Sequence, residues 1–236
     1  MFSIVVVLAP CAYAITVDQF TNNYPMNVDI PWETIFVGNK CNAASCPPGV
    51  VVTHAVSDFA SQTGLSGVIG GERYALITRT AGTASSTIYG SYNLLEIAHA
   101  TASNSIITLT YGMSSSMNSN FTTMGEMELQ INILDGELST TRPVPCTITV
   151  ISGRGTANEH TASVTKTLAI ASGVVAFPLS EFTLIDFTDV DGITYKFDAS
   201  AYAARAVDFS IGPLTTDEHQ VGVEPTTWGA VKSLFE

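Results

Sequence analysis

The sequence predicts an all-β protein made of two packed antiparallel sheets, with the jelly roll as the expected arrangement. Residues 126–133 (EMELQINI) alternate apolar and polar side chains, which is typical of a strand with one buried and one solvated face. Turn pairs such as Asp135-Gly136 and Ser172-Gly173 separate such segments at short intervals. No convincing helical period occurs before the C-terminal end, so a parallel β-α-β architecture is not expected.

Composition favours one exported domain. A chain of 236 residues with 46% hydrophobic residues can bury one sizeable core. Only 13% of the residues are charged, so hydroxyl and amide groups must cover much of the surface, as in secreted β proteins. The net charge of -12 disfavours binding to nucleic acid or to an anionic membrane, because both carry negative charge.

Residues 1–14 are predicted to be a signal peptide. They are apolar and end on Ala12-Tyr13-Ala14, a small-residue pattern that signal peptidase accepts, and they are too few to span a membrane. We therefore expect a secreted protein, extracellular or at the cell surface. In the alternative, the segment is retained and adds a strand to a neighbouring subunit. That strand would consist of Ile4, Val5, Val6, Val7 and Leu8.

The cysteines agree with export. Cys41 and Cys46 close a short loop before Pro47-Pro48-Gly49, and we expect them to form a disulfide. Cys146 opens an apolar run and is expected to be a buried free thiol.

The sandwich is expected to span residues 15–213. The stretch 67–80 (GVIGGERYALITRT) predicts a glycine turn that leads into a buried strand, with Glu72 and Arg73 pairing or hydrogen bonding near the turn. The expected strands lie at residues 15–20, 34–37, 50–56, 73–80, 87–92, 105–111, 126–133, 146–152, 163–170, 174–178, 193–197 and 206–211.

Residues 214–236 are expected to form a polar tail with a short amphipathic helix. Four apolar residues recur there at helical spacing: Trp228, Val231, Leu234 and Phe235. This helix would pack either on its own domain or on a partner.

No catalytic motif is present, and we expect no enzymatic activity. The histidines belong to no metalloprotease pattern, and the glycines of 67–71 lack the spacing of a phosphate loop. Asp186, Asp189 and Asp191 could bind calcium in a turn; the alternative is a solvated, hydrogen-bonded acidic turn. No other cofactor is expected. Asn120 begins an N-glycosylation sequon in a serine-rich loop.

Several stretches resemble the GGERDL-type secreted proteins of bacteria, which often carry a PEP-CTERM sorting tail. The matching residues are Asp18 and Phe20 of an early D-x-F and Gly70, Gly71, Glu72 and Arg73 of the G-G-E-R turn; Tyr74 and Ala75 replace the usual D-L. Residues 174–198 and 206–211 are similar to the closing strands of such domains. The resemblance implies a jelly roll, export, and association with the cell surface or the exopolysaccharide matrix. It implies no catalytic residues. Val223-Glu224-Pro225 is similar to the start of the sorting motif, but no membrane span follows it.

These observations predict a structural surface or matrix protein that self-associates into fibres through its terminal segments. The competing hypothesis is a carbohydrate-binding module with aromatic residues on a sheet face, for which Tyr89, Tyr92 and Tyr111 are the candidates. The expected partners are therefore other copies of the chain or a polysaccharide.

Overall fold

A computed structural model describes residues 14–20, 35–39, 54–55, 57–82, 86–91, 93–99, 103–132, 143–169, 172–201 and 207–218. Within these ranges the chain forms two sheets, one of eight strands and one of six. All strand pairings are antiparallel. The predicted antiparallel sandwich is therefore confirmed.

The eight-stranded sheet contains both β1 and the C-terminal strand. Its order is β12 (Gly173–Pro178), β9 (Met124–Asn132), β14 (Phe209–Glu218), β7 (Leu94–His99), β6 (Ser86–Ser91), β2 (Ile35–Asn39) and β3 (His54–Ala55), and β1 (Thr16–Asp18) also pairs with β14.

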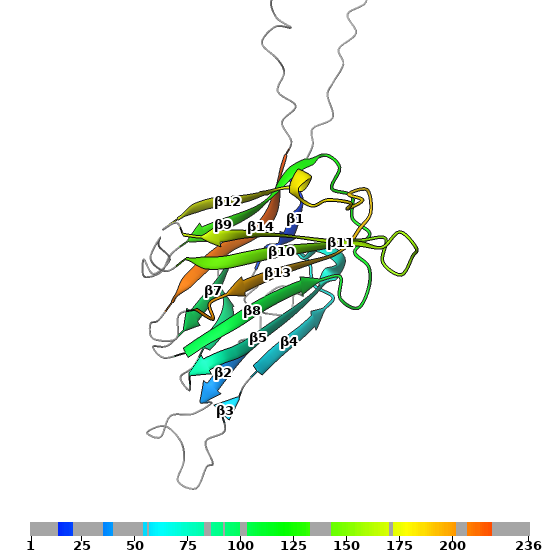
Figure 1. Ribbon diagram of the computed structural model, residues 1–236. Helices are drawn as coiled ribbons and strands as arrows, with labels where there is room; N and C mark the ends of the chain where they lie inside the picture. Colours follow the sequence, from blue (N-terminus) through cyan, green and yellow to red (C-terminus); the bar gives the residue numbers. More distant parts are fainter. Residues whose placement is uncertain are drawn as a thin grey trace, which may run out of the picture.

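The six-stranded sheet lies in front in Figure 1. Its order is β11 (His160–Leu168), β10 (Val144–Ser152), β13 (Val190–Asp198), β8 (Ser103–Tyr111), β5 (Glu72–Gly82) and β4 (Ser57–Thr63). Two single helical turns, η1 (Ile69–Gly71) and η2 (Leu179–Glu181), precede β5 and follow β12. Neither these turns nor any other part of the described chain has the length and apolar content of a membrane-spanning helix.

Alternation along each strand builds the core between the sheets. In β10 every second side chain is buried, from Val144 to Ser152, and the intervening ones are half-buried. The six-stranded sheet contributes Ile148 and Tyr195 to the core, and the eight-stranded sheet contributes Leu129 and Phe209. Cys146 lies in the same inward phase and is a buried free thiol, as the sequence predicts.

Two strands are absent from the expected set, and one strand continues further than expected. β4 and β7 are not among the expected strands. The sequence of β4 (SDFASQT) is mostly polar. In β7 (LLEIAH) the buried set of side chains ends on a polar residue, His99, which interrupts the apolar alternation. The last strand, β14, continues to Glu218, past the predicted end of the sandwich at residue 213. Its polar TTDE end still pairs with β9, although it reads as a tail in the sequence.

Several predictions fall outside the described residues. These are the Cys41–Cys46 disulfide, the apolar run 4–8 and the helix containing Trp228, and they stay predictions.

Candidate functional site

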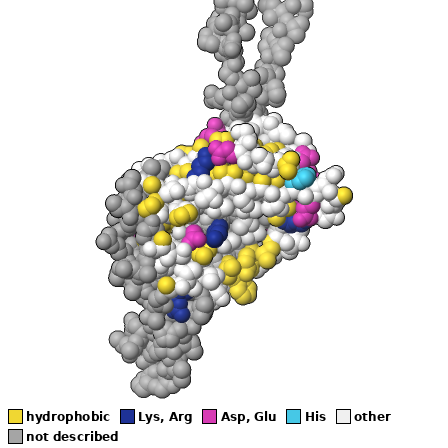
Figure 2. Space-filling view, in the orientation of Figure 1, with side chains coloured by type: hydrophobic (Ala, Val, Ile, Leu, Met, Phe, Trp, Pro, Cys, Tyr) yellow, Lys and Arg dark blue, Asp and Glu magenta, His cyan; other side chains and the backbone are white. Residues whose placement is uncertain are grey.

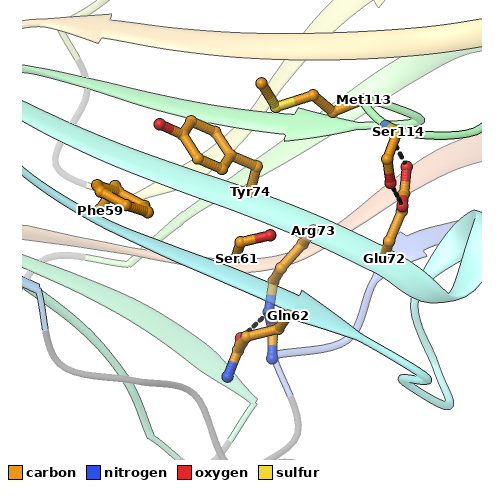
Figure 3. Close-up of a pocket in the computed structure, with 8 residues that line it drawn as sticks. All are labelled: Phe59, Ser61, Gln62, Glu72, Arg73, Tyr74, Met113 and Ser114. Atoms are coloured by element: carbon orange, nitrogen blue, oxygen red, sulfur yellow. Dashed lines mark hydrogen bonds between the residues drawn. The ribbon is translucent and has the colours of Figure 1, made fainter.

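Two aromatic rings stack on the outside of the six-stranded sheet at its β4 edge. Phe59 of β4 is 61% exposed, and the half-buried Tyr74 of β5 lies beside it with ring centroids 5.8 Å apart and planes 29° from parallel. Met113, just after β8, is 58% exposed and lies on the same side in Figure 3. Phe59, Tyr74 and Met113 are called the aromatic patch below. Exposed apolar groups gathered in one place are typical of interaction sites.

The period of the two strands places both rings outside. In β4, Phe59 shares its face with Ser57 and Ser61, whereas Ala60 and Gln62 are buried. Ser61 pairs with Tyr74, so the Tyr74 ring is a diagonal neighbour of Phe59 across the two strands.

A pocket of about 400 Å³ adjoins the aromatic patch. Its lining adds five polar residues to the three apolar ones: Ser61, Gln62, Glu72, Arg73 and Ser114 (Figure 3). Apolar walls with a few placed hydrogen-bonding groups are typical of small-ligand sites.

A buried polar network holds the inner side of this pocket in place. Arg73 Nη1 donates to Oδ1 and Oδ2 of Asp18, both at 3.0 Å, and Arg73 Nε donates to Gln62 Oε1 at 2.8 Å. The Tyr111 hydroxyl and the Phe20 N–H also donate to Asp18, at 2.9 Å and 2.8 Å. Arg73 is 4% exposed and Asp18 is fully buried, so this ion pair is removed from water. The network joins β1, β4, β5 and β8 under the site.

Burial raises the pKa of Asp18 above its ordinary value, because the interior solvates a carboxylate less well than water does. The charge of Arg73 and the hydrogen bonds from Phe20, Tyr111 and Arg73 lower that pKa and partly offset burial. Desolvation also raises the pKa of the Tyr111 hydroxyl, which therefore stays protonated and donates to Asp18.

Glu72 fixes the loop that carries Met113. Its Oε1 accepts the Ser114 N–H at 2.9 Å and the Ser115 N–H at 3.2 Å, and its Oε2 accepts the Ser114 hydroxyl. Burial raises the pKa of Glu72, but the hydrogen bonds from Ser114, Ser115 and Met113 outweigh it, and the pKa lies below the ordinary value.

Replacing Glu72 by glutamine is expected to make the protein less sensitive to acid. Since the folded-state pKa is lowered, the ionised carboxylate stabilises the fold above its ordinary pKa of 4.5, and this stabilisation is lost as pH falls through the folded value. The difference in Tm between wild type and Glu72→Gln should therefore shrink from about pH 6 to about pH 3. Thermal melts across this range measure it, and a constant difference would contradict the assignment.

The predicted pairing and hydrogen bonding of Glu72 and Arg73 near the turn is present, and the structure supplies the partners. Both side chains are buried, but Glu72 contacts the Ser114 loop whereas Arg73 contacts Asp18. The two halves of the family-like motif, Asp18-x-Phe20 and G-G-E-R, are thereby joined in space by the Arg73–Asp18 ion pair.

The predicted calcium ligands separate in the structure. Asp191 is 3% exposed and accepts the Arg154 N–H at 2.6 Å, whereas the exposed Asp186 accepts the N–H and the hydroxyl of Thr188. Those bonds lower the pKa of Asp186. Asp186 and Asp189 line a second, polar pocket of about 530 Å³, and Asp191 is not part of its lining. Calcium binding at this turn stays a prediction.

A different acidic group gathers on the eight-stranded sheet. Among the described acids, Glu126, Glu128 and Asp217 have carboxylate oxygens within 4.8 Å of one another. Burial and the nearby charges of Asp217 and Glu126 raise the pKa of Glu128. The sequence places the two glutamates on one face of β9, but Asp217 joins them only because β14 is longer than predicted.

The other predicted site residues have mixed outcomes. Tyr111, a candidate for carbohydrate contact, is fully buried, and that assignment is wrong. It packs edge-on against Tyr195 at 6.1 Å and donates to Asp18, so it belongs to the core. Tyr89 lies on β6, and its side chain, like Tyr92, is outside the described part of the structure. Asn120 is exposed and its Oδ1 accepts the Thr122 N–H at 2.9 Å; its glycosylation stays a prediction.

Phe59 and Met113 are not among the site residues that the sequence predicts, and Tyr74 enters there only as a departure from a motif. No pattern in the sequence marks Phe59, because both phases of SDFASQT are mostly polar: Ser57, Ser61 and Thr63 share its phase, and Asp58 and Gln62 lie in the other. Met113 follows its strand in a loop and likewise carries no signal.

Comparison with known proteins gives no family. No protein-family model and no curated protein matches the chain. Solved structures that match the chain include a family 11 carbohydrate-binding module from Clostridium thermocellum in complex with a mixed-linked tetrasaccharide, at 9% identity over 78% of this chain and 95% of that chain, with a TM-score of 0.36. A mutant of a family 29 carbohydrate-binding module matches at 10% identity over 75% of this chain and 97% of that chain, with a TM-score of 0.33. Likeness at this level assigns no function, which must come from the site's own residues.

Proposed function

We propose that this protein is a secreted, non-catalytic carbohydrate-binding β-sandwich whose binding site is the aromatic patch with its adjoining pocket. The observation that carries the proposal is the stacked pair of the exposed Phe59 and the half-buried Tyr74, beside a pocket with carboxylate, amide and hydroxyl groups. A sugar ring has an apolar C–H face and a rim of hydroxyl groups. Aromatic faces cover the former, and the polar lining can hydrogen bond to the latter.

The chemistry of the site favours a sugar over a purely apolar ligand. The stacked rings present carbon surface, but Ser61, Glu72 and Ser114 lie within the same pocket lining. An apolar ligand would remove the exposed Ser61 and Ser114 from water without returning hydrogen bonds, which costs free energy. A polyhydroxylated ligand forms hydrogen bonds with these groups in place of the ones that they made with water.

Retention on polysaccharides tests the proposal. The full chain is passed over beads carrying cellulose, xylan, mannan and chitin, with uncoated beads as control. We expect retention on at least one of these and release by an excess of the same soluble oligosaccharide. Absence of retention on all four overturns the carbohydrate-binding proposal.

The fibre hypothesis rests on terminal segments that lie outside the described residues, so it needs an experiment of its own. The same protein preparation serves for it. Sedimentation velocity and electron microscopy of the concentrated protein report any assembly. Filaments combined with no polysaccharide retention would replace the proposal by a structural role. Retention by a monomer would support the proposal.

A further inference from the structure

Two rows of hydroxyl-rich side chains cross the outer face of the six-stranded sheet and end at the stacked rings of Phe59 and Tyr74, called the aromatic pair below. The strand register aligns Ser163, Thr149, Thr194, Thr110, Tyr74 and Ser61, one from each strand from β11 to β4. The neighbouring row runs by the same pairings from Thr165 to Phe59 and includes Thr147 and Thr108. Each row therefore ends at one of the two stacked rings, or beside it.

The hydroxyl groups of these rows are available to a ligand. Thr149 and Ser163 hydrogen bond to each other at 2.8 Å, as do Thr147 and Thr165. A hydroxyl group has one donor and two acceptor positions, so each pair keeps a donor and several acceptors for other partners. The groups alternate with the buried core residues, and the face that they form is turned to solvent (Figure 2).

This face carries little charge. In the two rows the one ionised side chain among the described residues is Lys196, and its ammonium lies 3.4 Å from the Asp198 carboxylate. In Figure 2 the middle of the face is mostly white, with one charged pair near its centre and hydrophobic side chains gathered at its lower margin. The chain as a whole has a net charge of -12, which repels anionic ligands. An uncharged ligand fits the face best.

We infer that the ligand is an extended, uncharged polysaccharide that lies across the six strands, from the Phe59–Tyr74 pair at β4 towards Ser163 on β11. The inference rests on the proposed function and specifies its ligand. Strands are spaced by about 4.8 Å, so the rows are about 24 Å long. A single pyranose unit of an extended chain is close to one strand spacing in length. Successive sugars would then meet successive strands, with rings stacked at one end and hydroxyl groups hydrogen bonded along the rest.

Chain length and two remote threonines test the inference. Binding of cello-, xylo- and manno-oligosaccharides of two and six sugars to the full chain is measured by titration calorimetry, with NMR for weak complexes. We expect the hexasaccharide of at least one series to bind about tenfold tighter than its disaccharide, because more hydrogen bonds form. Thr149→Val with Thr194→Val removes two hydroxyl groups from the row while keeping side-chain shape. This double variant should bind the hexasaccharide several-fold more weakly and the disaccharide unchanged.

Thr167→Val is the matched control. Thr167 is an exposed threonine of the same sheet that pairs with Pro145, outside the two rows, and its replacement should leave both affinities unchanged.

The outcomes distinguish a failure of the inference from a failure of the proposed function. If the disaccharide binds as tightly as the hexasaccharide and the double variant changes nothing, the site is confined to the aromatic pair and the inference is overturned. If no oligosaccharide binds the wild type, both fall. Preference for acidic oligosaccharides, such as those from alginate, also overturns it.

Discussion

Replacing Phe59 by alanine is expected to lower the affinity for polysaccharide at least tenfold while leaving the Tm of the protein almost unchanged. The ring is 61% exposed, so the folded state gains little from it, whereas a bound sugar would cover it and its stacked partner Tyr74. Aromatic anchors at the centre of an interface commonly carry most of the binding free energy. Titration calorimetry with the retained polysaccharide measures the affinity, and a thermal melt checks the fold.

Two further variants show whether the ring itself is responsible. Phe59→Trp keeps an aromatic face and should bind close to the wild-type level. Leu184→Ala removes an even more exposed apolar side chain, 76% accessible, which lines the second pocket and not the first. It should bind normally. Equal losses in Phe59→Ala and Leu184→Ala would mean that general surface hydrophobicity, not this site, holds the ligand.

Replacing Arg73 by methionine is expected to destabilise the fold by about 3–5 kcal/mol at neutral pH. The substitution keeps much of the side-chain volume but leaves Asp18 buried without its positive partner, and it also removes the donor to Gln62. Chemical denaturation measures the free energy of unfolding. The loss should decrease in acid, because Asp18 then takes up a proton and its buried charge disappears.

The double variant Asp18→Asn with Arg73→Met should recover part of this loss, since no uncompensated charge remains. Lys196→Met gives the surface comparison. Lys196 pairs with Asp198 at 3.4 Å, but its side chain is 45% exposed, and its replacement should cost less than about 1 kcal/mol. Similar losses of unfolding free energy in Arg73→Met and Lys196→Met would show that the buried Arg73–Asp18 ion pair stabilises the fold no more than a surface pair does.

The fold was predictable because hydrophobic alternation reports burial directly. Strands such as β9 and β10, which have one apolar and one polar phase, could be placed within a few residues. β4 could not, because an edge strand buries few side chains and its sequence holds only Phe59 and Ala60 as apolar residues. The same strand carries the candidate site, and so the site was missed together with the strand.

The site itself depends on contacts that no local pattern reports. Asp18 and Arg73 lie 55 positions apart, and Tyr111 lies 93 positions from Asp18. Sequence reasoning identified Glu72 and Arg73 as a unit near a turn, which their adjacency suggests. Adjacent residues of a strand point in opposite directions. Glu72 therefore contacts the Ser114 loop, whereas Arg73 contacts the buried Asp18. Tyr89, Tyr92 and Tyr111 are candidates for carbohydrate contact by residue type alone, because no sequence pattern separates exposed from buried rings.

The alternation of inward and outward side chains in the six-stranded sheet has a consequence for how such a protein can diversify. Stability resides in one set of residues, including Ile148 and Tyr195, while the set between them faces solvent. Substitutions confined to the outward set can change which sugars are recognised without altering the packed interior. A library randomised at outward positions such as Thr110, Thr149 and Thr194 should therefore retain folded members at high frequency, which makes this sheet a usable scaffold for new glycan specificities.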